Sequence, residues 1–123
     1  RNAAASAGED ICEVKGVKLL TTALAKIEMN ELRNLGDSLL QKTDGGVAVL
    51  ASADEAQVNL LVMVGKAAEE KGANAGKLIK AIAPLIGGGG GGRPNIAQAG
   101  GKNPAGVQAA LEKAAEALEE ELA

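Results

Sequence analysis

The chain contains no phenylalanine, tyrosine or tryptophan in its 123 residues. A hydrophobic core must therefore be built from leucine, isoleucine, valine, alanine and methionine, because no aromatic ring is available to fill it. A chain of this length is long enough to bury one such core. We therefore expect a single small domain with an aliphatic interior.

Histidine is also absent, and Cys12 is the one cysteine. Without histidine the chain lacks the commonest general base near neutral pH, and one thiol cannot form an internal disulfide or a His/Cys metal site. We therefore predict no catalytic residue, no metal site and no cofactor in this chain. A lone cysteine of this kind fits a reducing cytoplasm. No apolar run approaches the roughly 20 residues that span a membrane.

The first half of the sequence predicts a strand, a helix and two further strands. Residues 17–24 (VKLLTTAL) are apolar and β-branched, as in a strand, and Asn30 can cap a helix through Lys42. On that helix Arg33 and Asp37 are four residues apart and can pair on the surface. Residues 47–52 and 58–65 are short apolar runs joined by a polar turn, which predicts an antiparallel hairpin.

The second half predicts two more helices around a glycine run. A helix is expected over residues 74–83, ended by Pro84, and residues 95–98 read as a short edge strand. Asn103 and Pro104 suit the start of a third helix, whose apolar stripe is formed by Val107, Leu111, Ala114, Leu118 and Leu122. That stripe can pack on the sheet or serve a dimer interface.

This order of elements predicts an α/β fold, a small domain with a mixed four- to five-stranded sheet packed with three helices. The first strand, helix and strand should form a parallel crossover. Residues 1–10 are rich in alanine and are expected to be a linker or the end of an upstream helical segment, while residues 11–123 form the globular domain.

Charge is unevenly distributed along the chain. The formal net charge is −3, but residues 57–106 carry six Lys or Arg against two Glu, a balance of +4. The segments on either side are acidic, and the glutamates of residues 107–123 read as the solvated face of the last helix. A basic segment between acidic ends is compatible with a local nucleic-acid contact.

Six consecutive glycines, residues 87–92, followed by Arg93 and Pro94, are the strongest local feature. Glycine lets backbone N–H groups approach a phosphate, and arginine adds a planar five-donor group. The run follows a helix rather than a strand, so it is not a dinucleotide fingerprint, and Arg93-Pro94 stands where a P-loop has Lys-Ser/Thr. From spacing alone, a phosphate-binding loop and a flexible linker both remain open.

The longer string from Ile86 through GGGGGG-RPNIAQAGG to Gly101 resembles the signature at the end of alanyl-tRNA synthetases, typically GGkGGGRPDxAQgGG. Residues 75–80 (AGKLIK) and 32–39 (LRNLGDSL) are similar to the same family, and the resemblance covers about residues 11–122. Two positions depart from the pattern. Gly89 stands where the family usually has Lys, which should weaken binding or leave it more dependent on Arg93, and Asn95 replaces the usual Asp.

The resemblance implies a DHHA1-like, C-terminal domain (C-Ala) that is not catalytic itself. It implies binding of tRNA(Ala) at the tRNA elbow, coupling of aminoacylation with editing, the rest of a synthetase chain as a partner and, in some members, a homodimer. The parent enzyme would be an ATP-dependent alanine–tRNA ligase of the cytoplasm using ATP, Mg and Zn. The predicted nucleic-acid-binding residues are Gly87, Gly88, Gly89, Gly90, Gly91, Gly92, Arg93, Gln98, Lys102, Lys77 and Lys80.

Two other functions fit the same residues. DHHA1 domains also cap DHH phosphoesterases, where the glycine run would hold a nucleotide, and the string RPN-x-AQ disfavours that reading. The domain could also act as a dimerisation module through the stripe of its last helix.

Overall fold

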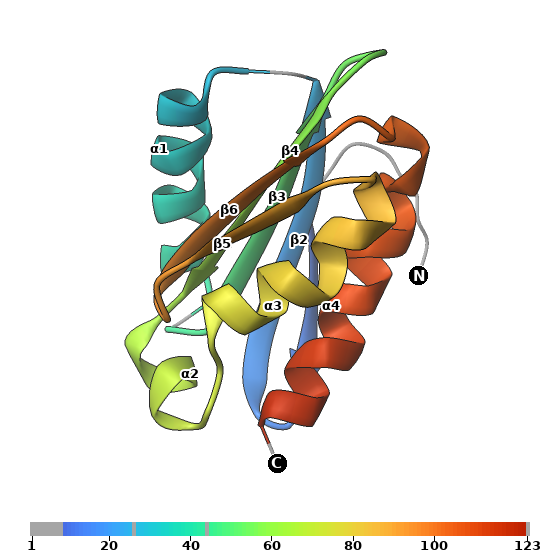
Figure 1. Cartoon of the computed structure of the whole chain (residues 1–123). Helices are drawn as coiled ribbons and strands as arrows, with labels where there is room; N and C mark the ends of the chain where they lie inside the picture. Colours follow the sequence, from blue (N-terminus) through green and yellow to red (C-terminus); the bar gives the residue numbers. More distant parts are fainter. Residues whose placement is uncertain (1–8, 26, 44, 123) are drawn as a thin grey trace.

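The computed structural model describes residues 9–25, 27–43 and 45–122, which form one β-sheet with helices on both faces (Figure 1). The strands are β1 (Glu9–Val14), β2 (Val17–Ala25), β3 (Val47–Ala53), β4 (Val58–Val64), β5 (Gly89–Gly92) and β6 (Ile96–Gly101). The helices are α1 (Met29–Gln41), α2 (Lys66–Glu70), α3 (Ala75–Ile82) and α4 (Val107–Glu121), with short 3₁₀ turns η2 (Ala83–Ile86) and η3 (Pro104–Gly106). None of the helices in these ranges is long and apolar enough to cross a membrane.

The sheet has six strands in the order β1-β2-β3-β4-β6-β5. Strands β2 and β3 are parallel and are joined through α1, as the strand–helix–strand pattern predicts. Strands β3 and β4 form the predicted antiparallel hairpin, whose turn is closed by the Asp54 carboxylate accepting hydrogen bonds from the backbone N–H groups of Ala56 and Gln57. Strand β6 pairs with β4, and β5 pairs with β6 at the end of the strand order. The glycines of β5 therefore form one edge of the sheet.

The central strands are buried on both faces because helices cover both. Along β3, Val47, Val49 and Ala51 face the larger core beneath α3 and α4, whereas Ala48 and Leu50 face α1. This alternation follows from the two-residue period of a strand. It explains why residues 47–52 read as a continuous apolar run with no polar side in the sequence.

The apolar stripe of α4 is part of the larger core. Leu118 and Ala114 are fully buried, and Leu111 is nearly so, within the single chain. The stripe therefore packs on the sheet, and this chain uses it internally.

The sequence prediction of the fold class is confirmed, but its element counts were too low. Within the described residues the sheet has six strands rather than four or five, and four α-helices are present rather than three. Strand β1 was missed because its charged residues hide the strand period, and α2 is only one turn long. Strand β6 was expected as an edge strand but lies between β4 and β5. The predicted linker falls largely on residues 1–8, outside the described ranges.

Two helix starts also differ from the prediction. Helix α1 begins one residue before Asn30, with Glu28 at its N-cap and no side-chain cap bond. Helix α4 is preceded by the η3 turn, so its N-cap is Gly106 rather than Asn103. By contrast, Asn74 caps α3, since its side-chain oxygen accepts a hydrogen bond of 3.1 Å from the backbone N–H of Lys77.

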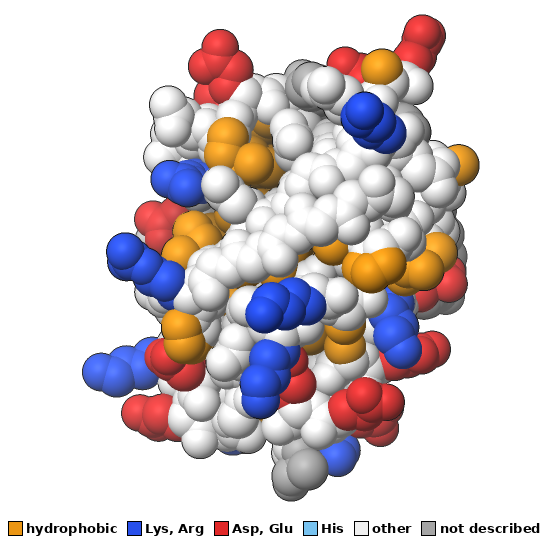
Figure 2. Space-filling model, in the orientation of Figure 1, with side chains coloured by type: hydrophobic (Ala, Val, Ile, Leu, Met, Phe, Trp, Pro, Cys, Tyr) orange, Lys and Arg blue, Asp and Glu red, His pale blue; other side chains and the backbone are white. Residues whose placement is uncertain are grey.

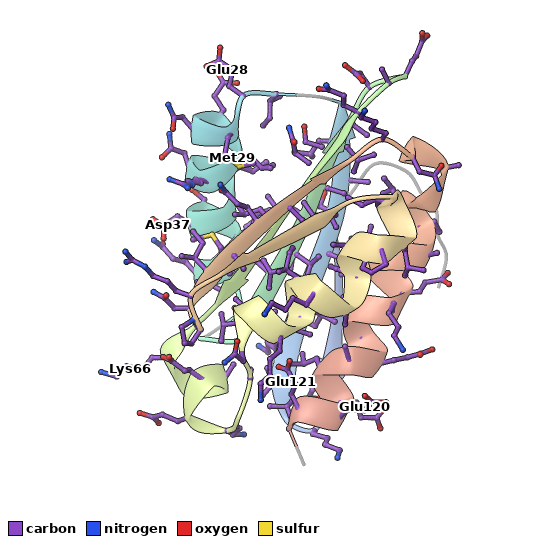
Figure 3. The ribbon with its side chains drawn as sticks, viewed as in Figure 1. Glu28, Met29, Asp37, Lys66, Glu120 and Glu121 are labelled. Carbon is purple, nitrogen blue, oxygen red and sulfur yellow. The ribbon has the colours of Figure 1, made fainter. Side chains whose placement is uncertain are left out.

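The C-terminal end of α4 is joined to the start of α3 through Glu121, which Figure 3 shows beside Glu120 near the foot of α4. The backbone N–H of Asn74 donates a 2.8 Å hydrogen bond to Glu121 Oε1. Burial raises the pKa of the Glu121 carboxyl, and this effect outweighs the hydrogen bond from Asn74 and the charge of Lys77, which both lower the pKa. The folded protein therefore holds the Glu121 proton more tightly than the unfolded chain does.

The raised pKa of Glu121 predicts how the substitution Glu121→Gln changes stability with pH. Ionised Glu121 costs folding free energy above its folded pKa, and the cost disappears below its ordinary value of 4.5. Because Gln keeps the oxygen that accepts from Asn74, the variant should be more stable than the parent in urea unfolding at pH 7. The two proteins should converge as the pH falls below 4.5.

The matched variant Glu121→Ala leaves the Asn74 N–H without its acceptor, so it should be less stable than Glu121→Gln by about 1 kcal/mol at every pH, because neither side chain titrates. A Glu121→Gln protein that is less stable than the parent at pH 7 would contradict the raised pKa.

Candidate nucleic-acid interface

The last four glycines of the run form an extended strand rather than a loop, and Gly87 ends the η2 turn in a left-handed conformation. Residues 89–92 form β5, which pairs antiparallel with β6 so that Gly91 lies opposite Gln98 and Gly89 lies opposite Gly100. Successive N–H groups of a strand point in alternating directions, so they do not converge on one phosphate as a loop would allow. As the edge strand of the sheet, β5 instead presents one row of its backbone groups outward.

Alternate glycines of β5 are required by close contact between two backbones. A Cβ atom on Gly90 would overlap the carbonyl oxygen of Gln98 and the Cβ of Ala99. A Cβ on Gly92 would lie 2.5 Å from the Cα of Ala97, closer than real Cβ contacts allow. The run is thus part of the folded sheet, which a flexible linker would not be.

The other positions of β5 are open. A Cβ on Gly89 would meet no atom within 4 Å, and Gly89 is exposed. Gly89 is also the position at which the resembling family usually has lysine, and a lysine there would extend into free space. The strand pair β5–β6, which we call the glycine ribbon, therefore presents a surface almost free of side chains, visible in Figure 2 as a white band.

Helix α3 lies along one side of the glycine ribbon. Its Gly76 packs on the end of β5, where an added Cβ would lie only 3.1 Å from the carbonyl oxygen of Gly92. Lys80 follows one turn later on the same side of the helix. Its Cε lies 3.9 Å from the position of a Cβ on Gly91, so the side chain runs beside the ribbon. Both Lys77 and Lys80 are exposed.

The other predicted cations stand at the two ends of the ribbon. Arg93 is exposed and begins the turn between β5 and β6, which is closed by a 2.8 Å hydrogen bond from its N–H to the carbonyl of Ile96. Lys102 is exposed just after β6, and its backbone N lies 4.0 Å from a Cβ built on Gly87. The fold thus places the glycine run, Lys80, Arg93, Gln98 and Lys102 around one edge of the sheet. Lys77 lies near the start of α3, where it interacts with the charge of Glu121.

One residue near this surface was not predicted to belong to it. Arg33 of α1 donates a 3.1 Å hydrogen bond from Nη2 to the side-chain oxygen of Gln98, and both side chains are exposed. The sequence suggests that Arg33 pairs with Asp37, and no such ion pair occurs among the described side chains. Arg33 and Gln98 are 65 positions apart, so no local spacing could have revealed their contact.

A separate hollow lies at the other side of the fold and shares no residue with the ribbon. It has a volume of about 190 Å³ and is bordered by Lys18 at the start of β2, Lys71 after α2 and the buried Thr43. The Thr43 hydroxyl is already committed, because it donates to the carbonyl of Leu40 at 2.6 Å and accepts from the N–H of Gly46 at 3.0 Å. Within the described ranges no three His, Cys, Asp or Glu side chains gather as a metal site would require.

Comparison with known proteins identifies the chain's relatives. A model of the DHHA1 domain matches residues 16–120. The chain is 56% identical over 112 residues to alanine–tRNA ligase 1 of Lachnoclostridium phytofermentans, and 52% identical over 110 residues to the alanine–tRNA ligase of Pelotomaculum thermopropionicum. These matches cover 91% and 89% of the chain but only 13% and 12% of the two ligases.

Solved structures give the same result. The C-Ala domain of Aquifex aeolicus alanyl-tRNA synthetase superimposes with a TM-score of 0.81 at 34% identity, and the match covers 89% of this chain and 98% of that domain. A DHH-domain protein that is described as a member of a family of ribosomal proteins shares the fold, with a TM-score of 0.64 at 15% identity over 94% of this chain and 28% of its own.

The two kinds of glycine in β5 predict opposite responses to alanine. Gly90→Ala should lower the free energy of unfolding by about 1–3 kcal/mol, because its methyl group overlaps β6. Gly89→Ala is the matched control, and it should be neutral or stabilising by up to about 1 kcal/mol, since the methyl group meets nothing and the unfolded chain becomes stiffer. Urea unfolding of both variants measures the difference. Equal losses in the two proteins would show that β5 is not paired with β6 in this register.

Proposed function

The chain belongs to the DHHA1 domain family, and on that premise we propose that it is the non-catalytic, tRNA-binding C-terminal domain of an alanine–tRNA ligase. In this role it binds the elbow of tRNA(Ala) and helps the aminoacylation and editing sites of the longer chain act on the same tRNA. The rest of the synthetase chain is its covalent partner. The ligase's ATP, Mg and Zn would bind in that remaining part.

The observation that carries this proposal is the exposed glycine ribbon with cations around it. Arg93 and Lys102 stand at its two ends, and Lys80 lies alongside β5. Figure 2 shows Lys and Arg side chains on more than one side of the white band. Cations around a surface without side chains can approach several phosphates while the backbone contacts sugars, which positions an RNA without reading its sequence.

The local charge of this edge favours RNA despite the net charge of −3. The glutamates of the C-terminal helix lie on α4, and Glu121 is turned inward to the start of α3, where its carboxylate accepts from the N–H of Asn74. The start of α3 is therefore occupied by a carboxylate of the chain itself. Phosphates are expected at Lys80, Arg93 and Lys102 instead, with Lys77 partly engaged by the charge of Glu121.

The cap domain of a DHH phosphoesterase remains the alternative enzyme-associated role. The structural similarity to a DHH-domain protein is at 15% identity, so it concerns the fold alone. The ligase relatives at 56% and 52% identity favour the tRNA-binding role. The coding sequence upstream of this chain distinguishes the tRNA-binding role from the phosphoesterase role. It should encode a synthetase core under the first and DHH motifs under the second.

A homodimer would need a surface other than the stripe of α4, which is buried within one chain. Light scattering over a range of protein concentrations tests it, and a mass that stays at the monomer value would exclude dimerisation of this domain.

Arg93→Ala should weaken binding of tRNA(Ala) and flatten its salt dependence. Loss of one phosphate contact should reduce the slope of log affinity against log salt by about 0.7–0.9. The measurement is a filter-binding titration between about 50 and 200 mM salt. The matched control is Lys113→Ala, because Lys113 lies on α4 and faces Glu116 at 3.8 Å.

Removal of Lys113 should leave both affinity and slope as in the parent protein. If Arg93→Ala also leaves both quantities unchanged, the assignment of the site to the ribbon fails. If the parent protein itself shows no affinity for tRNA, the proposed function fails.

A further inference from the structure

The hydrogen bond between Arg33 and Gln98 divides the glycine ribbon into two unlike sides. Gln98 projects from β6 on the side that α1 occupies, because its neighbours Ala97 and Ala99 face the core beneath α3. Lys80 comes from α3 and reaches over the β5 edge, where its Cε lies 3.9 Å from a Cβ built on Gly91, the residue opposite Gln98. A molecule bound across the ribbon would meet a lysine at the β5 edge, beside α3, and a polar pair on β6, beside α1.

The outer face of the ribbon, which Gln98 shares with Gly91, is bare except for this polar pair and the Lys80 side chain at its β5 edge. Gly89 and Gly100 lie opposite each other there, and residues opposite in an antiparallel ladder share a face. A Cβ on Gly89 would meet nothing within 4 Å, and one on Gly100 would be no closer than 3.6 Å to the Asn59 side chain. The pair therefore borders an open, flat area of backbone that a planar group can approach.

The charges that face each side differ as well. On α1, Asp37 lies one turn beyond Arg33, and Glu28 and Glu31 stand near the start of the helix, as Figure 3 shows for Glu28 and Asp37. These carboxylates offset the charge of Arg33. Beside α3, Lys80 lies along the ribbon, whereas Lys77 is attracted by the inward-turned carboxylate of Glu121. Phosphate is therefore favoured more strongly beside α3 than beside α1.

The Arg33–Gln98 pair retains many free donors. A guanidinium has five N–H groups, of which one is directed to Gln98, and the Gln98 amide nitrogen adds two more. The fork of a guanidinium and a side-chain amide are groups that match base edges and hydroxyl groups. With no aromatic ring in the chain, a base cannot be held by stacking on one.

We propose that the two borders of the ribbon contact different parts of a bound RNA: Lys80 binds phosphate beside α3, while Arg33 and Gln98 donate hydrogen bonds to an uncharged sugar or base edge beside α1. This inference rests on the proposed RNA-binding function. It makes Arg33 a binding residue, and it makes the geometry of its guanidinium, rather than its charge, the property that matters.

Two matched substitutions test the division, since Arg33→Gln and Lys80→Gln each replace one exposed cation by glutamine. Binding of the intact protein to tRNA(Ala) is measured between about 50 and 200 mM salt. Lys80→Gln should reduce the salt slope by about 0.7–0.9. Arg33→Gln should weaken binding about tenfold at every salt concentration, because it loses charge-assisted hydrogen bonds. It should leave the salt slope unchanged.

Arg33→Lys separates charge from geometry and should lose as much affinity as Arg33→Gln. Repeating the titrations with tRNA that carries 2′-deoxy substitutions at the contacted nucleotides distinguishes a sugar from a base edge, because the effect of Arg33→Gln shrinks if it binds a 2′-hydroxyl and persists if it binds a base.

Three outcomes would overturn the inference. In the first, Arg33→Gln flattens the salt slope as Lys80→Gln does, which makes Arg33 a phosphate contact. In the second, Arg33→Lys binds as tightly as the parent, which makes charge sufficient. In the third, Arg33→Gln changes nothing while Arg93→Ala weakens binding, so that the proposed function stands and Arg33 lies outside the surface. A parent protein without tRNA affinity would remove both proposals together.

Discussion

Direct contact between backbones, with no side chain between them, is the constraint on which this fold depends. Glycine allows it at several junctions: Gly46 packs on the carbonyl of Lys18, Gly101 on that of Ile86, and Gly106 on that of Leu85. In each case a Cβ would overlap the neighbouring backbone. A chain without aromatic residues has no large ring to fill the space between its layers, so its elements must approach closely to exclude water.

The same constraint shapes the candidate binding surface. Because β5 contributes no side chain, the charged and polar groups around the ribbon come from other parts of the chain: α1, α3, the turn after β5, Gln98 of β6 and the residue after β6. Their relative positions are fixed by the two cores on either side of the sheet. The candidate binding surface therefore depends on the whole fold, although the sequence segment that identifies the family is short.

Much of the scaffold is predictable from the sequence because local signals and tertiary structure agree there. The runs at residues 47–52 and 58–65 are apolar because both faces of β3 and β4 are buried, and Asn74 caps α3 by the local geometry that its side chain favours. Lys80, Arg93 and Lys102 were predicted from their positions beside the glycine run together with the family string, and the fold places them around one edge of the sheet.

Other features lacked a local signal. Glycine has little preference for strands, so the pairing of β5 depends on contacts with β6 and α3 that lie outside the run. The charged strand β1 is held by its partner β2, and its own side chains show no apolar period. The bond from Arg33 to Gln98 joins residues 65 positions apart, which come together because α1 packs on β3 and β4 and β6 pairs with β4.

A strand made of one residue type contains no information about its own alignment. Sliding β5 by one or two residues along β6 would exchange glycine for glycine, whereas in an ordinary strand such a slip would move the wrong side chains into the core. The alignment is instead fixed from outside, by the fully buried Ile86 before the run and by the hydrogen bond from Arg93 to Ile96 after it. The number of glycines therefore determines the alignment of β5 with β6, because the run must span the distance between these two anchors.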